Sequence, residues 1–385
     1  MNKIDDLVTK FCPNGVEYKT IEGVAELKRG TSITKEIIQP GEVPVIAGGQ
    51  KPAYYHNLSN RTGETIVIAG SGAYAGFVTF WTIPIFVSDA FSIIANNLVL
   101  PKYLYYFLKS KQSMLHDLKQ GGGVPHVYAK DVAPIRIPVP PLEVQKEIVR
   151  ILDIFTELEA ELEAELEARK KQYEYYRNQL LSFEAIDQTR PAVRWIRVMD
   201  IADYSKSRIS AKEISANNYV GVDNLLQNKQ GKTFSAYVPK TGNLTGYGKG
   251  DVLLGNIRPY LKKIWHADNY GGTNGDVLVI RIRKEFTKDL NSKFLYHLLA
   301  SDIFFVYNMQ HSKGTKMPRG DKSAILKYKI PFPSLNEQER IVTTLDKFEA
   351  LVTDVNKGLP AELTARRKQY EYCRSKLLTF QELEA

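Results

Sequence analysis

The chain has 385 residues, of which 43% are hydrophobic, and it carries a formal net charge of +9. This length exceeds one ordinary domain and suits two domains with connecting segments. Cys12 and Cys373 are the only cysteines, which excludes a disulfide framework and a cysteine-rich zinc cluster and favours a reducing compartment. The start of the chain lacks an apolar signal-peptide segment, and no stretch reaches the roughly 18 uninterrupted apolar residues of a membrane helix. We therefore expect a cytoplasmic protein without membrane contact.

A long internal repeat organises the chain. Residues 169–183 and 366–380 are identical at ten of fifteen positions and share the segment Lys-Gln-Tyr-Glu-Tyr. Shorter matches relate 67–70 to 252–255, 103–108 to 294–299, and 138–148 to 331–341. So long a period indicates one module present twice, because solenoid arrays repeat about every 20–50 residues. We predict a first globular segment, a central helix, a second globular segment and a C-terminal helical segment, at residues 1–141, 142–184, 185–334 and 335–385.

The first globular segment has the sequence of an α+β domain. Short apolar or alternating stretches bounded by glycine predict strands, such as 43–47, 65–69 and 77–81. A helix is expected at 103–118, then a glycine-rich loop and a strand that ends at Pro138. The loops between these elements hold basic, polar and aromatic side chains that can bind phosphates, bases or sugars. The candidate nucleic-acid contacts are Lys28, Arg29, Thr31, Ser32, Gln50, Lys51, Tyr54, Ser71 and Tyr74.

Residues 142–184 predict one long helix. The segment contains no glycine or proline and consists mostly of good helix formers. Apolar residues recur at a spacing of seven, as in Phe155 and Leu162, which is typical of a coiled-coil seam. Within it, Leu158, Leu162 and Leu166 recur every four residues among glutamates. Each such Leu-Glu-Ala-Glu unit spans about 6 Å of helix, so the tract is expected to act as a ruler.

The second globular segment is the most basic part of the chain. It carries 24 basic and 12 acidic residues, against 14 and 11 in the first globular segment, while both helical segments are net acidic. Positive charge concentrated in the globular parts favours a nucleic-acid ligand, the alternative being a basic surface that only maintains solubility. A strand is expected at 276–282, a helix at 294–307 and a closing strand that ends at Pro331. The candidate contacts are Lys206, Arg208, Lys240, Tyr247, Asn256, Arg258, Tyr260, Lys262, Lys263, Lys313, Lys316 and Arg319. For any one of these loop residues, ordinary turn chemistry is the alternative.

The C-terminal helical segment is interrupted at Gly358-Leu359-Pro360, where proline is expected to open a new helix. We expect the two helical segments to pack against each other in antiparallel fashion. The alternative is two independent helices, each covering its own domain.

Catalytic motifs are missing from the sequence. It contains neither a Gly-x-x-x-x-Gly-Lys-[Ser/Thr] phosphate loop nor the Asp/Asn/Ser-Pro-Pro-aromatic tetrad of an adenine methyltransferase. The six histidines form no pair at metal-binding spacing, and no convincing cluster of carboxylates with a lysine suggests a nuclease. We therefore predict a binding protein without catalytic residues or a metal site.

These features together resemble the specificity subunits of type I restriction-modification systems along the whole chain. Each globular segment ends in a proline-rich helix start that leads to a glutamine, at 138–145 and 331–338. Each helical segment ends in the repeated Lys-Gln-Tyr-Glu-Tyr motif, and the Leu-Glu-Ala-Glu tract is similar to the spacer repeats of that family. The fold expected from this resemblance is α+β, with two pseudo-repeated target-recognition domains joined by two long antiparallel, coiled-coil-like helices.

The resemblance implies that each domain reads one half of a split double-stranded DNA target and that the helices set the distance between the halves. It also implies a chain that catalyses nothing and binds no cofactor. Two methylation subunits would supply adenine methylation from S-adenosylmethionine, and restriction subunits would supply ATP- and Mg²⁺-dependent cleavage. The methylation subunits are expected to dock on the repeated helices, with candidate contacts at Tyr173, Tyr176, Leu180, Tyr370 and Leu377.

Two other functions remain open from the sequence. One is a self-contained modification enzyme, which the missing cofactor and catalytic motifs disfavour. The other is a basic coiled-coil scaffold, which would bind RNA or protein, or would bind nucleic acid without sequence preference.

Overall fold

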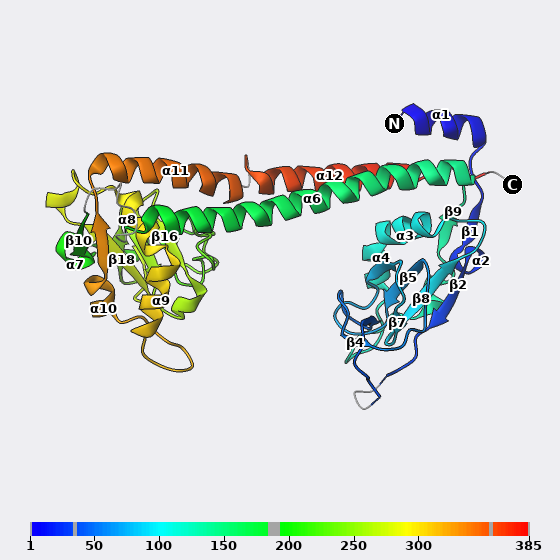
Figure 1. Ribbon diagram of the computed structural model, residues 1–385, viewed down its shortest axis with the longest axis horizontal. Coiled ribbons are helices and arrows are strands. Elements are labelled where there is room, and N and C mark those ends of the chain that lie inside the picture. Colours follow the sequence, from blue (N-terminus) through cyan, green and yellow to red (C-terminus); the bar gives the residue numbers. More distant parts are fainter. Residues whose placement is uncertain (1, 34–36, 184–192, 354–356, 384–385) are drawn as a thin grey trace. The chain divides into compact units, whose positions relative to one another are not determined.

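The computed structural model describes residues 2–33, 37–183, 193–353 and 357–383, and in it the chain divides into two compact units (Figure 1). The first unit consists of Met1–Leu162 together with Leu363–Ala385. The second unit is Glu163–Glu362. The residues at the end of the chain therefore belong to the same unit as its beginning.

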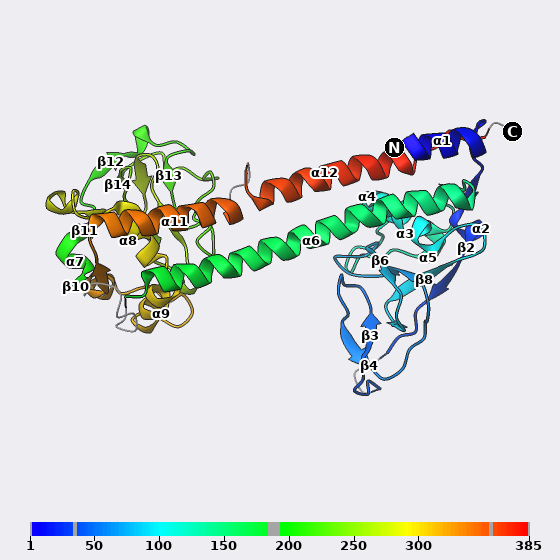
Figure 2. The same ribbon diagram turned by 45° about the horizontal axis from the view of Figure 1, so that its top comes forward.

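The first unit is built on a four-stranded antiparallel sheet with the strand order β2-β8-β5-β6. A smaller sheet has the order β4-β3-β7, and β1 pairs with β9 where the globular part begins and ends. Figures 1 and 2 show α3 on the side of the sheet toward α6, and β3 and β4 at the opposite end of the unit. The elements are α1 (Asn2–Phe11), β1 (Tyr18–Thr20), α2 (Ile21–Val24), β2 (Ala25–Arg29), β3 (Val43–Ile46), β4 (Tyr54–His56), β5 (Thr65–Ala69), β6 (Val78–Trp81), β7 (Phe86–Val87), β8 (Ala90–Ala95), α3 (Pro101–Ser110), α4 (Gln112–Asp117), α5 (Ala129–Val132) and β9 (Arg136–Pro138).

Strand β5 is buried along its whole length because both of its faces are covered. Ile66 and Ile68 point into the main core, which includes Tyr103 of α3. Val67 faces the other way, into a small cluster with Ile46 and other residues of the small sheet. Alternation of side chains along a strand produces this division, and it explains why the strand is apolar throughout.

The second unit repeats this architecture. Its main sheet has the order β11-β18-β15-β16, its small sheet the order β12-β14-β17-β13, and β10 pairs with β19. The elements are β10 (Arg194–Arg197), α7 (Val198–Ile201), β11 (Ala202–Tyr204), β12 (Arg208–Ser210), η1 (Ala211–Glu213), β13 (Tyr219–Val220), β14 (Asn243–Tyr247), β15 (Val252–Gly255), η2 (Pro259–Leu261), β16 (Ile264–His266), β17 (Gly271–Thr273), β18 (Val277–Ile282), η3 (Lys284–Phe286), α8 (Ser292–Leu299), α9 (Asp302–Gln310), α10 (Lys322–Lys327) and β19 (Lys329–Phe332).

The structure corrects two details predicted from the sequence. Ala69 pairs with Ala90, the first residue of β8, and Gly255 pairs with Val277, the first residue of β18. Because β8 and β18 are equivalent strands, Ala69 and not Gly70 is the counterpart of Gly255. The predicted alignment of 67–70 with 252–255 is therefore wrong by one residue. Each predicted helix near the end of a globular segment is also two helices, α3 with α4 and α8 with α9. In the second unit the break is made by Ser301, whose hydroxyl accepts a hydrogen bond from Phe304 N at 3.2 Å and so caps α9.

Two helical pairs complete the units, one in each. They are formed by α6 (Leu142–Leu181), α11 (Leu335–Thr353) and α12 (Leu359–Leu377). In the first unit Arg367 contacts Glu159 at 2.6 Å, and three residues later the ring of Tyr370 packs against that of Phe155 in a tilted arrangement, so α12 and α6 run antiparallel.

In the second unit Phe348 of α11 stacks against both Tyr173 and Tyr176 of α6, and Figures 1 and 2 show these two helices running in opposite directions. The predicted fold is thus confirmed, and the alternative of independent helices is wrong. Pro360 lies in the first turn of α12, as predicted.

A buried glutamine in the first turn of α6, and another in the first turn of α11, joins each helix to its globular domain by hydrogen bonds. The Gln145 side chain donates to the carbonyls of Leu98 (3.0 Å) and Pro140 (2.7 Å) and accepts from Leu100 N (2.8 Å). Its counterpart Gln338 makes the same three bonds, to the carbonyls of Asp289 and Pro333 and from Asn291 N. Both glutamines are fully buried, which accounts for the repeated proline-to-glutamine motif.

We expect Gln338→Ala to destabilise the second unit by about 2 kcal/mol, because three buried backbone groups lose their partner. For a unit of this size, this corresponds to a fall of about 4–8 °C in its thermal unfolding midpoint, measurable by calorimetry. Gln145→Ala should act equally on the first unit. The exposed Gln227→Ala serves as the control, and an equal fall in that variant would contradict the structural role.

Candidate nucleic-acid interface

In the first unit the predicted loop residues gather at one end of the main sheet. Lys28 and Arg29 end β2, and the loop after them bonds to the end of β7 through Thr31 N and Val87 O (2.9 Å). The Tyr54 hydroxyl reaches the Ile33 carbonyl at 3.4 Å, which brings the loop of Gln50 and Lys51 to the same place. The exposed members of this set are Lys28, Arg29, Thr31, Ser32, Gln50, Lys51 and Tyr74.

Two residues of this region have structural partners. Ser71 is buried and its hydroxyl donates to the Asp89 carboxylate, so it fixes the loop after β5. Arg61, which the sequence did not single out, is buried and donates to Ser92 Oγ (2.7 Å) and to the carbonyl of Arg29 (3.0 Å). Its guanidinium therefore holds the end of β2, and burial lowers the pKa of Arg61 from its ordinary value.

In the second unit eight of the twelve predicted residues are exposed. They are Lys206, Arg208, Lys240, Arg258, Tyr260, Lys313, Lys316 and Arg319. The other four are buried or half-buried. Tyr247 is buried and donates to the carbonyl of Asn218 (3.0 Å), Asn256 is buried beneath Gly320, and Lys263 donates to the Val222 carbonyl (2.6 Å).

Lys262, the fourth of these, belongs to a pair of strained loops. Among the described residues, every non-glycine residue with positive φ lies here: Asn228, Lys229, Arg258 and Lys262, with φ of 53°, 63°, 51° and 49°. The loops bond to each other through Asn228 N to Leu261 O and Lys229 N to Lys262 O, both at 2.9 Å. Left-handed backbone at a residue with a side chain costs about 1–3 kcal/mol, so other interactions must hold these loops in place.

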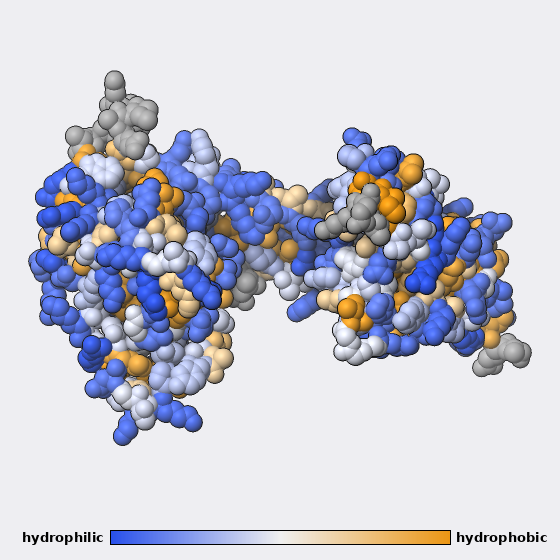
Figure 3. All heavy atoms as spheres, turned by 90° about the horizontal axis from the view of Figure 1, so that it is seen from below, coloured by the Kyte–Doolittle hydropathy of each residue, from blue (hydrophilic) through white to orange (hydrophobic). Residues whose placement is uncertain are grey.

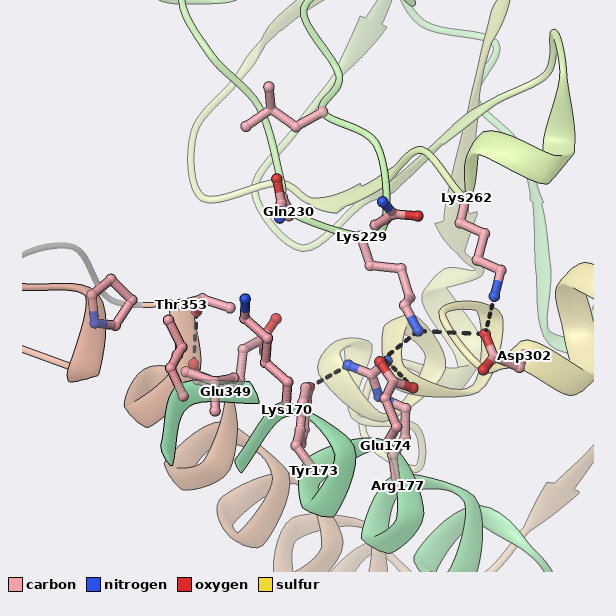
Figure 4. A pocket seen from close by; sticks show the side chains of 15 residues that line it. Lys170, Tyr173, Glu174, Arg177, Lys229, Gln230, Lys262, Asp302, Glu349 and Thr353 are labelled. Carbon is pink, nitrogen blue, oxygen red and sulfur yellow. Dashed lines mark hydrogen bonds and ion pairs between the residues drawn. The ribbon is translucent and has the colours of Figure 1, made fainter. Parts of the chain in front are cut away.

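An ion-pair chain supplies those interactions (Figure 4). Asp302, at the start of α9, accepts from Lys262 at 2.7 Å and from Lys229 at 3.4 Å, and Lys229 also reaches Glu174 of α6 at 2.7 Å. Burial opposes ionisation of Asp302, but the bonds from both lysines outweigh it, and its pKa lies below the ordinary value. The chain lines a cavity of about 710 Å³ and connects α6 to the turn of Arg258 and Tyr260.

The structure places the predicted partner-binding residues largely within the units. Tyr173 and Leu377 are buried, and Leu180 and Tyr370 pack against the two cores. Tyr176 is 36% exposed and stacks on Phe348. Whether any of them contacts a partner stays a prediction.

The same repeated motif does present two exposed tyrosines, which the sequence analysis missed. Tyr175 and Tyr372 occupy equivalent positions and are 58% and 65% exposed. Helical periodicity was the available signal, because a residue two positions from a buried one faces the opposite side of the helix.

Among the described residues, one group could hold a metal ion: His297, Asp346 and Glu349. Asp346 already accepts from Lys293 at 2.6 Å and lies 3.3 Å from His297 Nε2. The first unit has the same tie without a histidine, since Asp153 accepts from Lys102 (2.8 Å) and Tyr106 (2.6 Å). We therefore interpret the group as a structural link between α8 and α11.

No helix in the described part of the chain is long and apolar enough to cross a membrane. The face of the molecule drawn in Figure 3 is largely hydrophilic, with small separate apolar patches.

Comparison with known proteins decides the family. A model of the type I restriction modification DNA specificity domain matches twice, at residues 13–168 and 196–365. The chain belongs to the type I restriction-modification DNA specificity family. The EcoR124I/EcoR124II specificity subunit of Escherichia coli is 30% identical over 74% of this chain and 72% of its own length. A putative type I specificity subunit of Haemophilus influenzae is 28% identical over 95% of this chain and 96% of its own. The resemblance seen in the sequence is thus confirmed.

Solved structures support the fold of this family member. The S subunit of a type I restriction-modification system from M. genitalium superposes with a TM-score of 0.60 at 17% identity, covering 94% of this chain and 96% of that one. A chain from a type I system studied for its complex assembly and conformational transition gives a TM-score of 0.62 at 16% identity, covering 95% and 98%.

We expect Asp302→Asn to weaken DNA binding through the second unit by about tenfold, because the strained turn of Arg258 and Tyr260 loses the charge that holds Lys229 and Lys262. Binding titrations with the full chain in its complex measure this, and a thermal melt checks that the variant is folded. Asp203→Asn is the matched control, since it removes an exposed ion pair with Arg283 in the same unit. Equal affinities for both variants would show that the ion-pair chain does not position the turn.

Proposed function

We propose that this specificity-family chain reads a split double-stranded DNA target, one half-site with each unit. The observation behind this proposal is that one fold is present twice, with the same internal side-chain hydrogen bonds in both units but with different exposed loops. Gln145 and Gln338, or Asp153 and Asp346, make matching contacts in the two units. The exposed loops, by contrast, share almost no sequence, as two readers of different bases require.

The proposal extends to the partners. Two copies of a methylation subunit bind the repeated helices, and restriction subunits join the assembled complex. Tyr175 and Tyr372 support this arrangement, because an exposed aromatic residue repeated at equivalent positions suits one kind of partner bound twice. The chain itself acts as a non-catalytic subunit, with S-adenosylmethionine, ATP and Mg²⁺ bound by the partners. The missing catalytic motifs in the sequence support this division.

Base chemistry explains why recognition is separated from catalysis. A methyltransferase must turn the adenine out of the duplex, which costs stacking and pairing energy. A separate subunit that grips the DNA on both sides keeps the duplex in place while a partner acts on the extruded base. The rigid frame of each unit, with its fully buried glutamine, suits this holding role.

A genome-wide map of methylated adenine tests the proposal. Cells that carry the methylation partner are compared with and without this chain, and a split motif that depends on the chain is expected. If no such motif arises although the complex assembles, a basic scaffold without sequence preference becomes the better interpretation.

The ruler interpretation gives a further prediction. One extra Leu-Glu-Ala-Glu unit after Glu165 should lengthen the unspecified spacer by one or two base pairs, because about 6 Å of helix compares with 3.4 Å per base pair. Both half-sites should stay unchanged in the methylation map.

Glu161→Gln alters the same tract without changing its length and should leave the spacer as it was. An altered half-site after the insertion would show that α6 is not a passive spacer.

A further inference from the structure

Each unit carries the same short hairpin, after α4 in the first unit and after α9 in the second, although the two hairpins share only a glycine and a proline in sequence. We call residues 120–126 and 313–319 the tip hairpins. In the first, Gln120 and His126 exchange two backbone hydrogen bonds of 2.9 Å; in the second, Lys313 and Arg319 do the same. Each hairpin turns at a glycine with left-handed backbone, with φ of 104° at Gly121 and 94° at Gly314. In Figure 1 the second tip hairpin lies in the loop below α9.

The tip hairpins dock at the same place in each unit, on the loop that follows β5 or β15. Gly72 N donates to Pro125 O at 2.9 Å, and Arg258 N donates to Pro318 O at 2.7 Å. Gly72 and Arg258 both have positive φ, so the strain at Arg258 accompanies a docking geometry that glycine provides in the first unit. This loop also carries Tyr74 or Tyr260, which places each hairpin beside candidate DNA contacts.

The docking is reinforced by a matched side-chain contact. The first residue of each hairpin reaches an aspartate in or just before the short helix that follows, Asp131 within α5 or Asp321 at the N-cap of α10. Gln120 donates to Asp131 at 3.2 Å, and Lys313 pairs with Asp321 at 2.8 Å. Each hairpin is thus held at its base by both backbone and side-chain bonds, while its tip is left open.

Contacts within the described part of the chain do not explain why the first tip carries glycine at both Gly122 and Gly123. A Cβ added at Gly122 or Gly123 would meet no atom within 4 Å, and neither residue has positive φ. The fold therefore does not require glycine at either position. Val124 and its counterpart Met317 are 58% and 44% exposed. A glycine that the fold does not require leaves room for a bound molecule to approach the backbone closely.

We propose that the tip hairpins are a matched pair of sequence-independent DNA contacts that grip the sugar–phosphate backbone at each half-site. The inference rests on the proposed function, and it starts from the duplication. Surfaces that read different bases must differ between the units, whereas phosphate and deoxyribose are the same at both half-sites. An element with one geometry in both units suits the part of DNA that does not vary.

The tips offer different groups for the same ligand. In the first unit, bare glycine backbone brings N–H donors close to phosphate oxygens. In the second, the Thr315 hydroxyl and the Lys316 ammonium donate instead. Val124 and Met317 supply an apolar surface that packs on deoxyribose. Lys313 and Arg319 at the base of the second hairpin are paired with Asp321 and Asp276, but Lys316 at its tip is exposed, and this charge favours a polyanion over the other candidate occupant, a methylation subunit.

Charge reversal with matched neutral variants tests the proposal in the assembled complex. The variants are Gly123→Asp with Gly123→Ala as its control, and Lys316→Glu with Lys316→Ala. The open space around Gly123 lets either side chain fit without disturbing the fold. Affinity is measured for a duplex with the target motif and for a scrambled duplex, over a range of salt concentrations, and the methylated motif is mapped for each variant.

We expect Gly123→Asp and Lys316→Glu to weaken binding to both duplexes by the same factor, about tenfold near 0.15 M salt. Lys316→Ala should reduce the slope of log affinity against log salt by about 0.9. Gly123→Ala should weaken binding less than Gly123→Asp, because its methyl group hinders close approach without adding a negative charge, and the methylated motif should be unchanged throughout.

Three results would overturn the inference. A changed motif, or loss of affinity for the target duplex alone, would show that the hairpins read bases. Unchanged DNA affinity would exclude a DNA contact, and if methylation-subunit binding fell instead, the hairpins would be a docking surface. Failure of the proposed function looks different, because the unaltered complex would then bind both duplexes equally and methylate no split motif.

Discussion

The structure depends on the return of the C-terminal helix to the first unit. Each globular domain packs its main-sheet core against two helices, and the first domain receives its second helix from the far end of the chain. Leu377 and Leu378 are buried in that core, and the Tyr18 hydroxyl donates to the Phe380 carbonyl at 3.0 Å. Val16 N bonds to Gln381 O at 2.9 Å in the same place. The first unit therefore cannot complete its core until almost the whole chain is present.

A constant frame and variable loops are physically separate in this protein. The frame consists of buried strands such as β5, the glutamine ties and the helix pairs, all of which occur in both units in the same geometry. Buried amides and close-packed side chains tolerate little change, because an unmatched polar group or a void destabilises the fold. Exposed loops have no such restriction. The frame can thus hold different reading surfaces without being rebuilt.

The two units stabilise their loops by different physical means. The first uses the buried Arg61 guanidinium, whose donors hold the carbonyls at the end of β2. The second accepts left-handed backbone at Lys229 and Lys262 and holds it with the Asp302 carboxylate. This difference accompanies the uneven charge, since the second globular segment is far more basic. Lysines that neutralise Asp302 and Glu174 are part of that excess and are not available for phosphates.

The sequence by itself determined the duplication, the long helix that begins at residue 142, the helix break before Pro360 and the family. These depend on local composition and on identity between distant segments, which need no three-dimensional information. The tertiary structure decided which residues of β5 and β15 are equivalent and which loop residues are exposed. Tyr247, Ser71 and Lys263 have the side chains of nucleic-acid contacts, yet their partners are the carbonyl of Asn218, the carboxylate of Asp89 and the carbonyl of Val222. Such pairings join residues 18 to 41 positions apart, so only the folded chain brings them together. The glycine and proline that the two tip hairpins share already relate these loops in the sequence, but their common hairpin geometry became visible only through their backbone hydrogen bonds.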